Sequence, residues 1–289
     1  MPLLSIVIAN YNYGRFLGAA IESVLAQSCQ DFELIVIDGG STDNSVDVIR
    51  RYAGDLPAGE TRAAGRHSCL AYWISEKDKG QANAFNKGFA KARGRFLTWL
   101  NSDDVMLPGT IERLKHAAER YPDCEWFVGG SYWTNPDLRI WKCNPGRPFS
   151  EMRYRCGRVS AWGPSSFFTK RMLDAVGGVD ERFHYLLDAD LWLRFASRLG
   201  VRYRPFARYA YALRLHPQGK MSGHNFAGSA MCDPNHPKWR QIDQEGRWMR
   251  DYFPMLPFTW AVRLLSANWT AALIGLIDTL RLRGKRIKA

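Results

Sequence analysis

Closely spaced cysteines, glycine-rich phosphate loops and long apolar runs are all missing from this sequence. The six cysteines lie far apart, with no C-x-x-C pair and no histidines at zinc spacing. A zinc site or a disulfide framework is therefore disfavoured, and reduced thiols of a cytosolic protein are expected. The first apolar segment leads into residues 10–14, Asn-Tyr-Asn-Tyr-Gly, instead of G-x-G-x-x-G, and no G-K-[ST] motif occurs. This disfavours a Rossmann dehydrogenase and a P-loop enzyme, and the N-terminus lacks the basic region and cleavage site of a signal peptide.

Acidic residues are the scarcer charge, with 28 Asp and Glu against 40 Lys and Arg and a net charge of +12. The excess favours anionic partners, namely nucleotide phosphates, nucleic acid or a membrane surface, and charge alone does not choose among them. A hydrophobic fraction of 46% and a charged fraction of 24% are typical of a globular protein. The length of 289 residues fits one large domain or two small ones.

Apolar runs with strand character alternate with amphipathic helical patterns along the first half of the chain. Strands are expected at 4–9, 32–37 and 96–100, and helices follow each of them, the last with Thr110 as its cap. This rhythm indicates βαβ units and a mainly parallel sheet flanked by helices, as in Rossmann-like nucleotide-binding folds. Short strands are expected at 125–150, and residues before them, at 54–69, read as an irregular excursion.

Aspartates stand where three of the predicted elements begin or end. Asp38 ends the second strand, Asp103 and Asp104 follow a later one, and Asp188 and Asp190 open a helix. Open α/β sheets bind ligands at the carboxyl ends of their strands, and paired carboxylates there can hold a divalent cation that bridges phosphates. The alternatives are an ordinary polar turn for the first pair and favourable placement at a helix N-terminus for the second.

In this order, the motifs resemble those of family 2 glycosyltransferases of the GT-A fold, which assemble surface polysaccharides. The resemblance is carried by residues 5–12, 22–28, 37–43, 78–88, 97–108 and 188–194, with a late segment at 214–220. Residues 5–12 and 22–28 form one opening pattern, and with it the ranges up to 188–194 give five matches in the correct order, which are specific together although each alone is weak. The resemblance implies a GT-A-like α/β catalytic domain at 1–222 and a helical C-terminal extension at 223–289.

The resemblance also implies an activity. It is inverting transfer of a sugar from a nucleotide-diphosphate sugar, most often a UDP-sugar, to a hydroxyl of a glycan or lipid-linked acceptor, with Mn²⁺ or Mg²⁺. Asp188 matches the catalytic base, and Asp38 would accept a hydrogen bond from the nucleobase. Asp104 matches the direct metal ligand, and Asp103 would reach the ribose or the metal. His216 would complete the metal shell, the alternative being a plain loop histidine beside a proline.

Further site residues follow from the same motifs. The other candidates for binding the nucleotide sugar are Ala9, Asn10, Tyr11, Lys79, Gln81, Asn86, Arg214 and Lys220. Trp162 and Asp190 are the candidates for contacting the acceptor. Three positions depart from the family pattern, because Gly39, Asn101 and Leu187 stand where the family often has carboxylates. The predicted site is therefore less acidic than is usual for this family.

The C-terminal segment combines an apolar run with a basic end. Residues 264–277 form a charge-free run of 14 residues, too short to span a membrane. Five basic residues follow it, namely Arg281, Arg283, Lys285, Arg286 and Lys288. An interfacial helix on an anionic membrane is one reading, and packing onto the catalytic domain or a second subunit as a homodimer is the other. The expected location is the cytoplasm, at the inner face of the cytoplasmic membrane if the segment binds lipid.

Two rival functions remain open at this stage. The net charge of +12 would suit a basic nucleic-acid-binding protein, which would bind DNA or RNA with a steep salt dependence. A non-catalytic relative that only binds nucleotide sugars is the other, and the retention of Asp38, Asp104 and Asp188 argues against it. The expectation is a nucleotide-sugar enzyme without a nucleic-acid partner.

Overall fold

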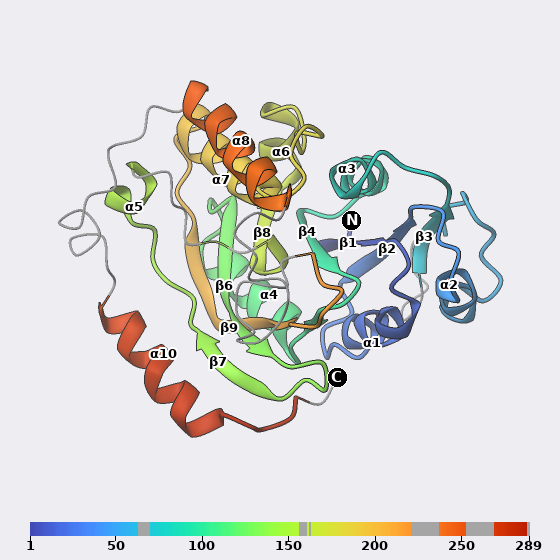
Figure 1. The fold of residues 1–289 in the computed structure, drawn as a ribbon, viewed down its shortest axis with the longest axis horizontal. Coiled ribbons are helices and arrows are strands. Elements are labelled where there is room, and N and C mark those ends of the chain that lie inside the picture. The colour runs from blue at the N-terminus through green and yellow to red at the C-terminus, as the bar shows by residue number, and fades with distance from the viewer. Residues whose placement is uncertain (63–69, 156–160, 162, 221–236, 253–268, 288–289) are drawn as a thin grey trace.

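One nine-stranded sheet organises the protein. The computed structural model describes residues 1–62, 70–155, 161, 163–220, 237–252 and 269–287. The strand order is β3-β2-β1-β4-β8-β6-β9-β5, and β7 pairs with β6 (Figure 1). The strands are β1 (Leu4–Asn10), β2 (Phe32–Asp38), β3 (Leu70–Ser75), β4 (Phe96–Asn101), β5 (Val105–Met106), β6 (Trp126–Thr134), β7 (Ile140–Asn144), β8 (Ser166–Thr169) and β9 (Arg204–Arg214).

The N-terminal half of the sheet is parallel, and its strands end in register. β1 pairs in parallel with β2 and with β4, so that Asn10 lies opposite Asp38, and Ala9 lies opposite Asn101. β8 then pairs antiparallel with β4 and β6, while β6 and β9 are parallel. The predicted α/β class is confirmed, and the register brings the polar strand ends to one edge, as the carboxyl ends of parallel strands require.

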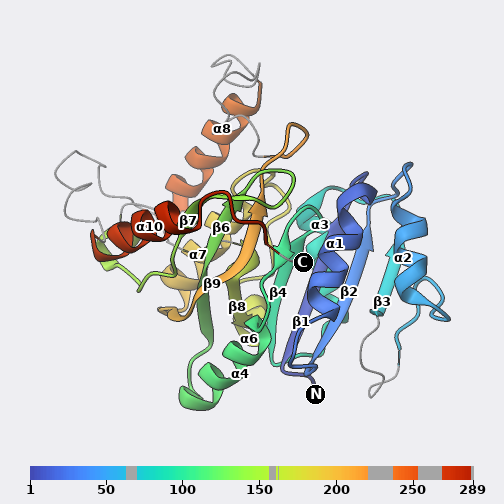
Figure 2. The same ribbon diagram turned by 90° about the horizontal axis from the view of Figure 1, so that it is seen from below.

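Helices cover both faces of this sheet (Figure 2). The buried side chains of α1 (Gly14–Leu25), α2 (Ser45–Ala53) and α4 (Thr110–Arg120) share one core cluster with Ile6 and Ile8. Val7, between those two, belongs to the opposite cluster, as the period of two in a strand dictates. The helices that pack in that second cluster are α3 (Gln81–Lys91), α6 (Lys170–Ala175), α7 (Leu187–Arg198) and α8 (Pro237–Tyr252).

One local prediction needs correction, and one strand was not predicted. Thr110 does not cap its helix: α4 has Gly109 as N-cap, and the Thr110 hydroxyl instead donates to the carbonyl of Ala210 at 2.9 Å. The irregular excursion ends in a strand that the sequence analysis did not assign, β3, whose Trp73 indole N–H donates to the Leu56 carbonyl at 2.9 Å. Ala210 and Leu56 lie 100 and 17 residues from their partners in the sequence. Local sequence patterns cannot predict contacts over such separations. The short elements α5 (Glu151–Arg155) and η1 (Gly163–Ser165) complete the central part.

The last described helix, α10 (Trp269–Leu282), packs along β7 at the edge of the sheet. The hydroxyl oxygen of Thr279 accepts a hydrogen bond from the Cys143 N–H at 2.9 Å, and a Cβ at Gly275 would come within 2.8 Å of the Cys143 carbonyl oxygen. After the helix, the Ile287 N–H donates to the Leu138 carbonyl at 2.9 Å. Packing onto the rest of the chain is thus one role of the C-terminal segment. The first part of the predicted apolar run, 264–268, lies outside the described residues.

Candidate active site

A cleft of about 780 Å³ opens where β1, β2 and β4 end. The loops after these strands form one side of it, and the start of α7 and the segment after β9 form another. Eight of the predicted site residues line the cleft, namely Ala9, Asn10, Tyr11, Gln81, Asp103, Asp188, Arg214 and Lys220. The sheet register therefore gathers in one place residues that lie up to two hundred positions apart in the sequence.

Asp38 lies beneath this cleft and is fully buried. Its carboxylate accepts hydrogen bonds from Asn10 Nδ2 at 2.7 Å, from the Ser75 hydroxyl at 2.6 Å, and from both the N–H and the hydroxyl of Ser41 at 2.9 and 2.6 Å. A carboxylate offers about four lone-pair positions, so these four bonds use its capacity. The structure therefore gives Asp38 a supporting role for the loops of the cleft, in place of the predicted contact with the nucleobase.

Gly39 stands at a position where the family often has a second carboxylate, and the side chain of Asp78 fills the space beside it. A Cβ on Gly39 would lie 2.7 Å from Asp78 Oδ2, so a side chain at position 39 and the present position of Asp78 exclude each other. The N–H of Gly80, which has a φ of +112° that favours glycine, donates to Asp78 Oδ1 at 2.7 Å. Asp78 lines the cleft, and the sequence analysis did not single it out.

The Asp103-Asp104 pair is divided between the cleft and the interior. Asp103 lines the cleft, and its Oδ2 lies 3.1 Å from His216 Nε2. Asp104 is almost fully buried and accepts hydrogen bonds from Asn101 Nδ2 at 2.8 Å and from the Arg214 N–H at 2.9 Å. Burial, and then the charge of Asp103, raise the pKa of Asp104 well above its usual value. Asp103 is therefore the carboxylate that faces the cleft, and the predicted roles of the two residues toward a metal stay predictions.

These residues fit a divalent cation. Asp103 and Asp104 are adjacent carboxylates, and the charge of Asp103 adds to burial in raising the pKa of Asp104. A cation beside the pair would offset their mutual repulsion. Carboxylates and a histidine nitrogen form a ligand set suited to Mn²⁺, and carboxylates with phosphates suit Mg²⁺. Among the described residues no group of three or more His, Cys, Asp or Glu is arranged as a metal site. The remaining ligands would therefore come from a diphosphate and water.

Asp188 and Lys220 lie in the same cleft. Asp188 opens α7, and its Oδ1 accepts the N–H of Ala189 at 2.8 Å. Burial raises the pKa of Asp188, and Lys220 opposes this shift. Burial also lowers the pKa of Lys220 to about 8, while the charges of Glu245 and Asp188 act in the opposite direction. Lys220 Nζ donates to Gln81 Oε1 at 2.8 Å, which fixes the ammonium group at the edge of the cleft.

Besides Asp38, Asp104 and His216, three further predicted site residues in the described part of the chain do not line the cleft. Asn86 bonds both the carbonyl and the N–H of Val179, at 2.8 and 2.9 Å, and so ties α3 to the loop before α7. Lys79 is exposed, and its N–H contacts the side chain of Asn83 at 3.3 Å. Trp162 lies outside the described residues, so its predicted contact with the acceptor stays a prediction.

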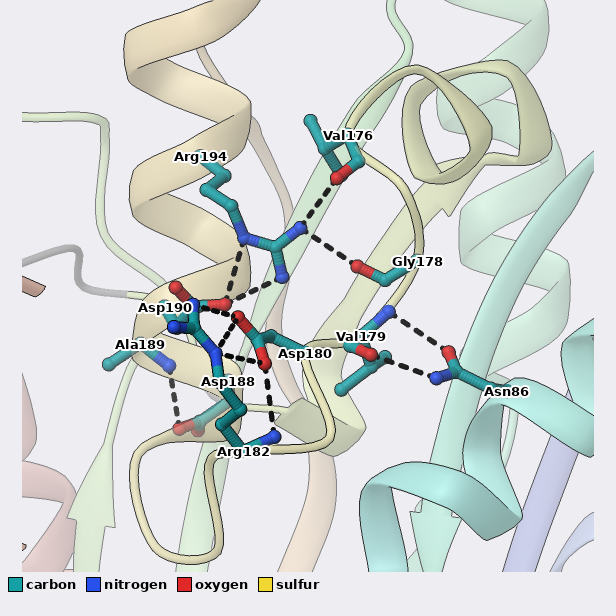
Figure 3. A network of polar contacts seen from close by, with 10 residues as sticks. All are labelled: Asn86, Val176, Gly178, Val179, Asp180, Arg182, Asp188, Ala189, Asp190 and Arg194. Carbon is teal, nitrogen blue, oxygen red and sulfur yellow. Dashed lines mark hydrogen bonds and ion pairs between the residues drawn. The ribbon is translucent and has the colours of Figure 1, made fainter. Parts of the chain in front are cut away.

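Asp190 is the third, and it is buried away from the cleft. Figure 3 shows it facing Arg194, which also donates to the carbonyls of Val176 and Gly178. Arg194 Nη2 lies 2.6 Å from Asp190 Oδ2, and both side chains are at most 5% exposed. This buried, hydrogen-bonded ion pair holds the loop at Gly177 and Gly178 against α7. The predicted contact of Asp190 with the acceptor therefore gives way to a structural role.

Replacing Asp190 by asparagine is expected to lower the free energy of unfolding by about 3–5 kcal/mol, because it leaves the buried Arg194 charge uncompensated. Urea denaturation measures the change. Asp180→Asn is the matched control: Asp180 pairs with the more exposed Arg182, where loss of the pair should cost only about 0–1 kcal/mol. Equal effects of the two substitutions would show that the buried pair has no special weight.

Residues that the sequence analysis missed come from loops. Tyr185 and His184 line the cleft just before α7, and Lys220 Nζ lies 5.7 Å from the centre of the Tyr185 ring. Gly163 also lines it, and a Cβ there would lie 2.6 Å from the Trp99 ring, so only glycine fits. In the sequence, the only indication of His184 and Tyr185 was their position shortly before the family motif at residues 188–194.

The sequence is similar to those of known glycosyltransferases. A sequence model described as Glycosyl transferase family 2 matches residues 5–176. The PGL/p-HBAD biosynthesis glycosyltransferase of Mycobacterium bovis is 36% identical over 197 residues, which cover 68% of this chain and 70% of that protein. Matches to other curated glycosyltransferases cover less of the relative, 31% of one from Nostoc and 58% of one from Rickettsia prowazekii.

Solved structures share the fold. S. aureus TarS 1-349, in complex with UDP-GlcNAc, superposes with a TM-score of 0.54 at 14% identity and covers 81% of this chain and 61% of its own. The mannosyltransferase PcManGT from Pyrobaculum calidifontis, in complex with GDP-Man and Mn²⁺, has a TM-score of 0.55 at 14% identity and covers 96% and 87%. At these identities the likeness shows the GT-A fold alone. The match over residues 5–176 and the 36% identical mycobacterial relative establish that this protein belongs to glycosyl transferase family 2.

Proposed function

We propose that this protein transfers a sugar from a uridine diphosphate sugar to a hydroxyl group of a glycan or lipid-linked acceptor, with inversion at the anomeric carbon. The observation that carries the proposal is the content of one cleft. Asp103, the cations Arg214 and Lys220, and the acid Asp188 all line it, and His216 contacts Asp103 from behind. The cleft volume of about 780 Å³ suits a nucleotide sugar.

The diphosphate would bind between the two cations and the acidic pair. Arg214 is largely buried, and its Nε finds no acceptor among the residues that the structure describes, so it can donate to a phosphate oxygen. Lys220 is linked to the acidic pair by a chain of hydrogen bonds, from its Nζ through Gln81 to Asn101, and from Asn101 to Asp104. A divalent cation held by Asp103, beside His216, would neutralise charge on the leaving diphosphate.

The nucleobase would meet Asp78. Its carboxylate lines the cleft beside the bare backbone of Gly39, whereas that of Asp38 is occupied. A carboxylate can accept the imide N–H that uracil carries, and this supports UDP over nucleotides whose bases lack such a group. One TarS structure is a complex with UDP-GlcNAc, which agrees with this choice.

Asp188 would act as the general base. Its carboxylate takes the proton from the acceptor hydroxyl, whose oxygen then forms a bond to the anomeric carbon as the bond from that carbon to the phosphate oxygen breaks. A single displacement inverts the configuration. The raised pKa of Asp188 suits this role, since a base works best when its pKa approaches the working pH.

A lipid-linked acceptor is supported by the exposed face of α10. Leu273, Leu276, Ile277 and Leu280 are between 52% and 72% exposed and follow helical spacing on one side. Exposed basic residues continue this end of the chain, namely Arg281, Arg283, Lys285 and Arg286. No described helix has the length and apolar character needed to span a bilayer. We therefore place the enzyme peripherally on the anionic inner face of the cytoplasmic membrane, with residues 1–222 as the part of the catalytic unit that carries the family motifs.

The double substitution Leu276→Glu with Leu280→Glu is expected to abolish flotation with anionic liposomes, because it puts two charges into the apolar face that would enter the interface. Lys115→Glu, on an exposed position of α4, changes the net charge by the same amount and should float almost like the wild type. If the wild type itself ignores anionic liposomes, the apolar face of α10 belongs to a protein interface instead.

The decisive test of the function is a screen of nucleotide sugars. Thermal stabilisation and hydrolysis are measured for UDP-, GDP- and other nucleotide sugars, with and without Mn²⁺. We expect selective stabilisation by UDP-sugars that requires the metal. Steeply salt-dependent binding of DNA or RNA, without any response to nucleotides, would support the rival nucleic-acid function and contradict the proposal.

A further inference from the structure

A buried carboxylate from the C-terminal part of the chain holds the segment that leads into the candidate base. Glu245 lies on α8 and is fully buried. Its Oε1 accepts the N–H of His184 at 2.9 Å, and its Oε2 accepts the N–H groups of Tyr185 and Leu186 at 2.9 and 2.8 Å. Three successive backbone donors thus point at one side chain that lies about sixty residues later in the sequence.

These donors lie in the segment that enters α7. Leu186 is the N-cap of α7, and it has no side chain that could cap the helix. Hydrogen bonds to a carboxylate are among the stronger ones in proteins. Glu245 therefore serves as a cap supplied from another helix, and it fixes the backbone at the point where α7 begins.

The segment that Glu245 holds is also part of the cleft. His184, Tyr185, Leu187 and Asp188 all line it. Asp188 comes two residues after the last amide bound by Glu245, so the position of its carboxylate depends on how the chain enters α7. A shift of the entry by about 1 Å would carry the base away from the acceptor hydroxyl, and misplacement of that size can cost about 100-fold in rate.

The rest of α8 keeps the carboxylate in place. Met249 belongs to the core cluster of the α7 face, and the ring of Trp248 packs edge-on against that of Phe183 at 5.8 Å. Gln241, one turn before Glu245, donates to Glu245 Oε1 at 3.1 Å. The carboxylate is therefore anchored on both sides, by its own helix and by the core.

We propose that Glu245 is a positioning residue of the reaction, which holds residues 184–186 so that Asp188 faces the cleft. This role rests on the proposed function, in which Asp188 is the base. It also means that α8 completes the catalytic unit, although it lies beyond the boundary at residue 222 that the motifs suggested.

The test combines hydrogen exchange with kinetics on the full-length chain. Glu245→Gln keeps the size of the side chain but presents an amide group to backbone donors. Amide exchange at residues 184–186 should become at least about tenfold faster, kcat should fall about 10- to 100-fold, and KM for the UDP-sugar should stay within about twofold. Asp243→Asn is the control, because Asp243 is an exposed carboxylate on the same helix that pairs with Arg247; it should leave all three unchanged.

The outcomes separate the ideas. Unchanged exchange in Glu245→Gln would overturn the contact, and faster exchange with wild-type kcat would overturn the positioning role. A loss of thermal stability alone, with kcat unaffected well below the unfolding temperature, would also overturn it. A wild-type chain that turns over no nucleotide sugar overturns the proposed function and the role of Glu245 with it, whereas an active wild type confines any failure to Glu245.

Discussion

Replacing Asp188 by asparagine is expected to lower kcat by about 100- to 10,000-fold while UDP affinity stays near that of the wild type. Asparagine keeps the shape of the side chain, and its carbonyl oxygen can still accept the N–H of Ala189. It cannot take a proton from the acceptor hydroxyl. Steady-state transfer assays give kcat, and calorimetry with UDP and Mn²⁺ gives the affinity.

The pH dependence provides an independent check on Asp188. A base must be ionised, so kcat/KM should fall as the pH drops through the pKa of Asp188, which burial raises above its usual value. The residual activity of Asp188→Asn should lack this acid limb. Asp174→Asn removes an exposed carboxylate outside the cleft and should change neither quantity. Transfer at the wild-type rate by Asp188→Asn would remove Asp188 from the mechanism.

The sequence predicted the parts of the site that local patterns and strand order determine. Strand ends carry polar residues to the carboxyl edge of a parallel sheet, and for this reason Asp103 was expected there from the sequence. Asn10 was predicted from the family motif at residues 5–12, and the register of β1 brings it to the same edge. Asp188 was found because its helix motif matches the family. These residues line the cleft as a direct result of topology and register, which hydrophobic patterning encodes.

The roles of buried polar residues could not be predicted in the same way. Asp38, Asn86 and Asp190 have the right identity for binding, yet their hydrogen-bonding capacity is used within the protein. Whether a polar side chain faces a ligand or a neighbour depends on partners that the fold brings from elsewhere. Glu245 is the converse case, since nothing near it in the sequence marks it as part of the site.

Because Asp103 faces the cleft and Asp104 is buried, the second large effect is expected at Asp103. Asp103→Asn is expected to abolish the strengthening of UDP binding by Mn²⁺, with a loss of affinity in the presence of the metal of about 100-fold or more. Asp103 is the carboxylate that faces the cleft beside His216, and asparagine offers a cation no negative charge. Calorimetry of UDP with and without Mn²⁺ measures the loss, and binding without metal should hardly change.

Substitutions at the two neighbours show which residue binds the cation directly. His216→Ala should weaken the effect of Mn²⁺ less than Asp103→Asn, because Arg15 Nη2 lies 3.4 Å from His216 Nδ1. Arginine can only donate, so Nδ1 of His216 acts as the acceptor and the proton is favoured on Nε2. Nε2 is the nitrogen beside Asp103 that would have to bind the metal, and a protonated nitrogen cannot do so.

Asp104→Asn should chiefly lower the unfolding temperature, because both Asp104 oxygens accept internal hydrogen bonds. If Asp104→Asn loses the response to Mn²⁺ while Asp103→Asn keeps it, then Asp104 is the direct ligand and the loop must rearrange when the nucleotide binds.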